Sequence, residues 1–304
     1  MTILPNADFE LPEYWRKWLG TIQVEEIADC TLFLLVRMAS TLPDALNEED
    51  QKLRRLIGHW YTGLTLTSKF ETSDAAFLAH GYCQDGSINI RQFAPIDPPL
   101  ASIVKKYRDS ISVNQLRHAS EIAQRLSLLT DTLSSSNWRL LRCLKLYQDA
   151  RCNRDVLERI HQFTRCIEGL IAGDQGNTTR QFKSRTETFV GPHCHDLMGK
   201  LYQVRSDVEH SNENLDLEEF DREARITLAK LEALSEWIAR SCLDRIILNP
   251  VLSNHFGNIV NIRRFWALST DERREIWGSA INPDLAFADF NFQYVSNQEL
   301  GASE

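Results

Sequence analysis

One apolar stripe constrains the fold of this chain more strongly than any other feature of its sequence. Between residues 156 and 170, apolar side chains recur at steps of four, three, four and three residues, at Val156, Ile160, Phe163, Ile167 and Leu170. An α-helix has about 3.6 residues per turn, so this spacing places all of them on one helical face. Because such a face must be buried against other elements, the stripe predicts a bundle of helices.

The same helical spacing continues on both sides of the stripe, from about residue 112 nearly to the C-terminus. We expect further helices around residues 116–129, 138–147, 182–189, 197–208, 217–242, 261–268 and 271–277. Breaks are predicted at Gly173–Asn177 and at Gly191-Pro192, and Thr178 or Thr179 is expected to cap the helix between them. The tail after Gly278 has no helical period, so no helix is expected there.

The first 110 residues have a mixed character. Apolar positions within 21–40 predict a helix, which Pro43 ends, and a second helix follows Asn47 as its N-cap and runs through Trp60. Two short apolar runs flank Asp85-Gly86, a dipeptide that favours a tight two-residue turn. We therefore expect a two-stranded hairpin near residues 75–94, followed by a proline-rich link.

These patterns together predict a mainly α protein with three regions. Residues 1–110 form an α+β region that carries the hairpin. Residues 111–248 form a helical domain whose core is 150–248, and residues 249–304 form an appendage of short helices and a tail.

Charge and cysteine content limit the classes of function. The chain has 34 Lys and Arg against 42 Asp and Glu, a net charge of −8, which argues against a general nucleic-acid coat protein. Residues 138–210 nevertheless hold 12 basic against nine acidic residues, so a locally basic face is compatible with the sequence. The seven cysteines show no CxxC spacing, no apolar run reaches membrane-spanning length, and no positively charged leader is seen at the N-terminus. We expect a cytoplasmic protein with reduced thiols and no membrane span.

A possible site of chemistry lies at the end of the helix predicted around 197–208. The segment reads Tyr202-Gln203-Val204-Arg205-Ser206-Asp207-Val208-Glu209-His210. A pattern of Arg and His five residues apart is common by chance, and the context is what sharpens it. Two helices precede this one within the 150–248 core, and a long helix follows it.

In this context the segment resembles the motif of the HEPN superfamily, specifically its Apea-like branch. The resemblance covers about residues 150–248 and is supported by Arg159–Leu170 on the first helix and Gln181–Arg185 on the second. It implies an up-down four-helix core and a metal-independent endoribonuclease in bacterial defence, toxin or stress settings, usually a homodimer. Other members have lost cleavage and bind RNA or a protein partner, so a non-catalytic module is the rival interpretation. No cofactor and no metal are expected.

The two motif residues suit RNA cleavage by the 2′-hydroxyl group. His210 can move a proton near neutral pH, and Arg205 offers a planar, permanently charged fork for the phosphate. Five residues along a helix correspond to roughly 140° and about 7.5 Å of rise, so one pair cannot comfortably enclose a phosphate. Two copies facing across a dimer axis could do so, and single-stranded RNA is the expected partner.

Ser206, Asp207, Glu168 and Tyr202 are candidate supports for this pair. Ser206 lies four residues before His210 and could orient its ring, and Asp207 borders the motif. Glu168, at the edge of the apolar stripe, is expected to pair with Arg205, either positioning it or making it purely structural. Glu209 competes for the same arginine, and Tyr202 is expected in the core or at its rim.

Three other patterns have simpler explanations. His193-Cys194-His195-Asp196 contains metal-binding residue types but lacks a second ligand pair, so a polar loop that caps the next helix through Asp196 is favoured over zinc. Cys166 is expected to be a small buried side chain. Arg263–Trp266 and Arg273–Gly278 interleave basic and aromatic residues as RNA-stacking surfaces do, but two short packed helices explain them better.

Overall fold

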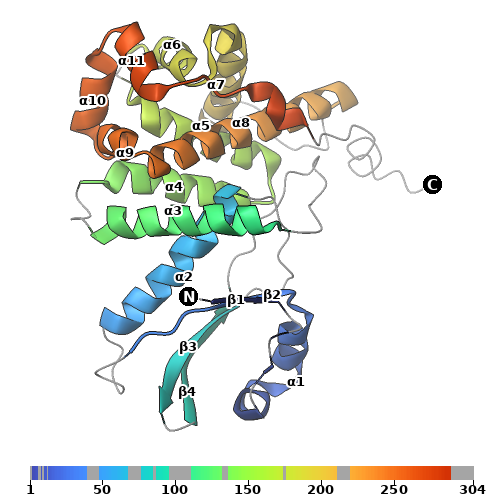
Figure 1. Cartoon of the computed structure of the whole chain (residues 1–304). Helices are drawn as coiled ribbons and strands as arrows, with labels where there is room; N and C mark the ends of the chain where they lie inside the picture. Colours follow the sequence, from blue (N-terminus) through green and yellow to red (C-terminus); the bar gives the residue numbers. More distant parts are fainter. Residues whose placement is uncertain are drawn as a thin grey trace.

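The computed structural model describes residues 2–5, 8, 10–11, 13–39, 48–67, 77–84, 87–95, 111–131, 136–173, 176–210 and 220–288. In this part of the chain the structure is mainly helical, with two small β-ribbons in its N-terminal third. Figure 1 shows the helices that follow residue 111 gathered in the upper part of the molecule and the ribbons below them. The prediction of a mainly α protein with an N-terminal hairpin is confirmed.

The helices of the upper part follow one another with short connections. They are α3 (Val113–Asp131), α4 (Trp138–Cys152), α5 (Val156–Ile171), α6 (Thr178–Val190), α7 (His195–His210), α8 (Arg222–Leu248), α9 (Pro250–Phe256), α10 (Ile259–Ala267) and α11 (Thr270–Trp277). Each helix predicted after residue 111 is present, but α8 begins at Arg222, so Phe220 precedes it, and Leu217 of the predicted 217–242 lies outside the described residues. The sequence analysis did not predict α9, which Asn249 starts by accepting hydrogen bonds from the backbone N–H groups of Val251 and Leu252.

Helix α5 carries the apolar stripe and lies at the centre of the core. It packs against α4, α7 and α8, and the five stripe residues are all buried. The Asp155 side chain starts the helix by accepting from the backbone N–H groups of Leu157 and Glu158, and Ala172 ends it in the left-handed region. A fully buried aliphatic side chain contributes about 1.5–3 kcal/mol, so the stripe is a main source of the stability of this bundle.

The N-terminal part contains two antiparallel ribbons and two helices. Strand β1 (Thr2–Pro5) pairs with β2 (Leu32–Leu35), and β3 (Phe77–Gln84) pairs with β4 (Ser87–Pro95). Between the strands lie α1 (Glu13–Asp29) and α2 (Glu48–Thr67), of which α2 packs along α3. The predicted hairpin is confirmed, although its Asp85-Gly86 turn and the predicted cap Asn47 lie outside the described residues.

The predicted helix over residues 21–40 is wrong in its second half. Helix α1 ends at Asp29, and Leu32–Leu35 form a strand in which Leu35 lies opposite Thr2. A short apolar run satisfies a helix or a strand equally well, and the pairing with a segment about 30 residues earlier decides between them. That pairing is invisible to local periodicity.

Two smaller expectations also need correction. Asn177, not Thr178 or Thr179, is the N-cap residue of α6, and its side chain makes no capping hydrogen bond. In the tail, Pro283–Phe287 form a 3₁₀ helix that packs on α8 and buries Ala286. The Trp237 indole N–H of α8 donates to the Asn282 carbonyl and ties this turn to the bundle.

Two glycines of α2 give a matched test of how closely α2 and α3 pack. A Cβ atom at Gly63 would lie 2.3 Å from the Ala119 carbonyl oxygen, whereas a Cβ at Gly58 meets nothing within 4 Å. Gly63→Ala is expected to lower the free energy of unfolding by about 1–3 kcal/mol, because the backbones must move apart. Gly58→Ala is expected to raise it by up to about 1 kcal/mol through helix propensity. Urea denaturation of both variants measures the difference, and equal effects would contradict the close approach.

Candidate functional site

Polar side chains line the contact between α5 and α7, and the predicted motif lies among them. Glu158, His161 and Glu168 come from α5, and Arg205 and Glu209 come from α7. These five residues, called here the α5–α7 seam, are spaced so that each helix presents its members toward the other, since residues three or four apart share a helical face. The seam joins the two helices through His161 with Glu209 and through Arg205 with Glu168, and Glu158 contacts His161 within α5.

Arg205 is held in the seam by a carboxylate from each helix. Its Nη2 atom lies 3.1 Å from Glu168 Oε2 and 3.7 Å from Glu209 Oε2, and its side chain is 16% exposed. The predicted pairing of Arg205 with Glu168 is therefore confirmed, as is the competition from Glu209. This pairing fixes the guanidinium between α5 and α7.

Tyr202 forms the apolar wall beside this guanidinium. Its side chain is 7% exposed, its ring centroid lies 5.0 Å from that of Phe182, and the Arg205 Cζ atom lies 5.6 Å from the Tyr202 ring. Such a distance is within the range of a cation–π contact. The expectation that Tyr202 belongs to the core or its rim is confirmed.

His161 completes the seam and was not singled out from the sequence. Its Nε2 atom lies 2.8 Å from Glu209 Oε2, and its Nδ1 atom lies 3.4 Å from both carboxylate oxygens of Glu158. The imidazole is 8% exposed. One signal could have found it, because His161 lies seven residues before Glu168 and therefore on nearly the same helical face.

Glu209 contacts both His161 and Arg205, and both residues lower the pKa of its carboxyl group. The hydrogen bond from His161 and the positive charges of Arg205 and Arg165 lower the pKa of this carboxyl group, against a smaller opposing effect of burial. Glu209 is thus ionised at neutral pH. Because the folded-state pKa is the lower one, the stabilisation it provides is present above the ordinary carboxyl range and is lost as the pH falls through that folded value.

His210 is exposed to solvent, unlike the buried His161. It is the last residue of α7 and its side chain is exposed. Within the described part of the chain Ser206 makes no hydrogen bond to His210, and Asp207 accepts one from the Gln203 amide at 2.8 Å. The suggested orienting role of Ser206 therefore has no direct contact to support it.

The other patterns find structural explanations. Residues Pro192–Cys194 form a 3₁₀ turn, so α7 begins at His195 and Asp196 lies in its first turn instead of capping it. His195 Nδ1 lies 2.6 Å from Glu187 Oε1, and no group of three or more metal-ligating side chains occurs among the described residues. Cys166 is fully buried, and burial raises the pKa of its thiol well above the ordinary range. Trp266 and Trp277 are buried, as the simpler explanation required.

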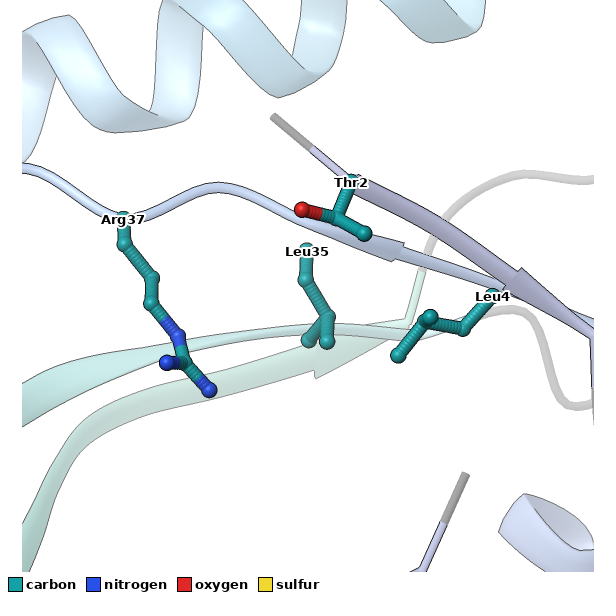
Figure 2. Close-up of a pocket in the computed structure, with 4 residues that line it drawn as sticks. All are labelled: Thr2, Leu4, Leu35 and Arg37. Carbon is teal, nitrogen blue, oxygen red and sulfur yellow. The ribbon is translucent and has the colours of Figure 1, made fainter. Parts of the chain in front are cut away.

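A hollow lies elsewhere, along the β1–β2 ribbon. Thr2, Leu4, Leu35 and Arg37 line it, and Figure 2 shows the leucine and arginine side chains extending to the same side of the ribbon. It contains one cation and no acid, base or nucleophile that could work with it. We therefore place the candidate site at the α5–α7 seam and the adjoining end of α7.

Comparisons with known proteins add no second line of support for this choice. No protein-family model, no curated protein and no solved structure matches the chain. No helix in the described ranges is long and apolar enough to cross a membrane. The functional assignment accordingly depends on the residues and their geometry.

Proposed function

We propose that α5–α8 form a HEPN-like up-down bundle and that the chain is a metal-independent endoribonuclease that acts as a homodimer. In this proposal Arg205 binds the scissile phosphate and stabilises its added negative charge. His210 moves the proton as the 2′-oxygen bonds to phosphorus and the bond from phosphorus to the 5′-oxygen breaks. The products are a 2′,3′-cyclic phosphate and a 5′-hydroxyl. Bacterial defence, toxin or stress response is the proposed setting.

The observation that carries the proposal is the pairing of Arg205 with Glu168 across two helices. A long, flexible arginine loses entropy when it is fixed on a ligand, and a carboxylate partner fixes it in advance. Glu168 also comes from the last turn of the central, buried helix, which is a rigid support. The same α7 ends in an exposed histidine, as the chemistry requires.

A second candidate function is favoured by one specific feature of the seam. Arg205 faces two carboxylates, and this neutralises much of the charge that a phosphate would meet. Such an arginine also suits a non-catalytic module that binds RNA or a protein partner. The two candidates differ in whether wild-type protein cleaves RNA or only binds it.

The deciding experiment is cleavage of a labelled single-stranded RNA by wild-type protein in excess chelator, with light scattering on the same sample. We expect a cyclic-phosphate product, a dimer at micromolar concentration and no stoichiometric metal by elemental analysis. RNA binding without cleavage would favour the module. A monomer that stays monomeric on adding RNA would contradict the shared site, and activity restored only by zinc would move the site to His193, Cys194 and His195.

Arg205 variants test the role of the guanidinium. Arg205→Ala is expected to lower the cleavage rate by about 10²- to 10³-fold, because one charged stabiliser of the transition state is lost. Arg205→Lys should rescue poorly, since the ammonium retains the charge but not the planar fork. The exposed Arg142 of α4 provides a control, and Arg142→Ala should cleave at the wild-type rate. Full activity of folded Arg205→Ala would remove Arg205 from the site.

A further inference from the structure

The proposed function gives no role to His161 of the seam. The contacts run in sequence from Glu158 to His161, from His161 to Glu209, from Glu209 to Arg205 and from Arg205 to Glu168. Glu209 Oε2 is the atom shared by both side chains, 2.8 Å from the imidazole and 3.7 Å from the guanidinium. The histidine therefore holds the carboxylate more closely than the arginine does.

The geometry around the imidazole fits its protonated form. Each ring nitrogen faces a carboxylate, Nδ1 toward Glu158 and Nε2 toward Glu209. A neutral imidazole has only one N–H group and can donate to only one of them, whereas the imidazolium donates to both. When the ring is neutral, Glu209 loses a charged partner, and the cations left near it are Arg205, at 3.7 Å on the same helix, and Arg165 of α5.

On this basis we propose that His161 is a positioning residue for Arg205. The imidazolium binds Glu209 and so keeps this carboxylate from pairing more closely with the guanidinium. Arg205 can then bind an RNA phosphate. When His161 loses its proton, Glu209 turns to Arg205 one helical turn away and competes with the phosphate. The inference deepens the proposed function and depends on it, since the ligand of Arg205 is taken to be RNA.

Among the charged groups around His161, Glu209 is the carboxylate that links it to Arg205. On α5 itself they are Glu158 and Arg165, and on α7 they are Glu209, its neighbour His210, and Arg205. The buried carboxylates of α8 are engaged elsewhere, Glu232 with Arg159 and Glu236 with Arg151 of α4 and Arg240. Arg159 lies two residues before His161, which is roughly the opposite side of α5. Arg185 of α6 and Trp266 of α10 meet α5 at its C-terminal carbonyls.

The test measures RNA affinity against pH without cleavage. The probe is a fluorescent 2′-O-methyl oligouridylate, read by anisotropy between about pH 5.5 and about pH 8.5, the range in which histidine titrates. All variants carry His210→Ala, so that titration of His210 does not enter. With His161 and Glu209 intact, affinity should fall by about tenfold across this range, since a hydrogen bond to a charged group is worth at least about that factor.

Two variants should make the RNA affinity independent of pH, one at low affinity and the other at high affinity. His161→Gln removes the titrating charge, so affinity should be weak at every pH. Glu209→Gln removes the competing carboxylate, so affinity should be tight at every pH. If His161 only held the two helices together, both variants should bind RNA more weakly. Their affinities would then not change in opposite directions.

His195 provides a matched control, because it pairs with Glu187 at 2.6 Å between α7 and α6. His195→Gln should keep the pH profile of the background protein. A profile of His161→Gln that follows the background protein would overturn the inference while leaving RNA binding, and thus the proposed function, intact.

A second measurement does not involve RNA and separates failure of the inference from failure of the proposed function. A double-mutant cycle with Arg205→Met and Glu209→Gln, followed by thermal unfolding, reports how strongly the two side chains interact. We expect a stronger interaction at about pH 8.5 than at about pH 5.5, and the difference should vanish in His161→Gln. An interaction independent of pH would overturn the inference. If the interaction depends on pH as expected but no RNA binds, it is the proposed function that fails.

Discussion

Replacing His210 by alanine is expected to lower the rate of RNA cleavage by about 10²- to 10⁴-fold, the usual contribution of a general acid–base group. The fold should survive, because the His210 side chain is exposed at the last position of α7. The measurement is single-turnover cleavage of a labelled single-stranded RNA, on protein whose folding is checked by thermal melting.

The exposed His193, in the 3₁₀ turn that precedes α7, is a natural control for this substitution. His193→Ala should cleave at the wild-type rate, because neither the seam nor the end of α7 includes it. A folded, dimeric His210→Ala protein that cleaves at the wild-type rate would end the enzymatic assignment. Loss of activity in His193→Ala together with chelator sensitivity would point to the metal alternative.

The largest expected effect on stability comes from the buried ion pair between α5 and α8. Arg159 Nη2 lies 2.6 Å from Glu232 Oε1, and the two side chains are 1% and 0% exposed. Arg159→Met should lower the free energy of unfolding by about 3–5 kcal/mol, because it leaves a buried carboxylate without its counter-charge. Urea denaturation followed by circular dichroism measures the loss.

Two further variants distinguish the buried charge from simple loss of contacts. Combining Arg159→Met with Glu232→Leu should recover most of the stability, since a buried ion pair can be replaced by apolar side chains at little cost. On the surface of α4, Lys145 pairs with Asp149 at 2.7 Å, and both side chains are well exposed. Lys145→Met should therefore cost at most about 1 kcal/mol. A loss in Arg159→Met as small as that would contradict the importance of the pair.

Much of the helical part of this protein was predictable, because the information is local. The spacing of Val156, Ile160 and Phe163 by itself predicts α5, and all three side chains are buried. The hairpin of β3 and β4 was predictable for the same reason, since it joins adjacent segments through a dipeptide that favours turning. The strand Leu32–Leu35 was not, because its partner Thr2–Pro5 lies far from it in sequence.

The candidate site, too, was predictable only where the information is local. Sequence alone determined that Arg205 and His210 share a helix, that Glu209 lies one turn from Arg205 and that Glu168 borders an apolar face. Tertiary structure alone decided that His161 reaches Glu209, and it set how closely the two predicted carboxylates approach Arg205. The physical reason is that spacing along a helix determines direction around its axis, whereas contacts across helices depend on how α5 and α7 are rotated and aligned against each other. That alignment is set by the packing of buried side chains over the whole bundle, and no local pattern contains it.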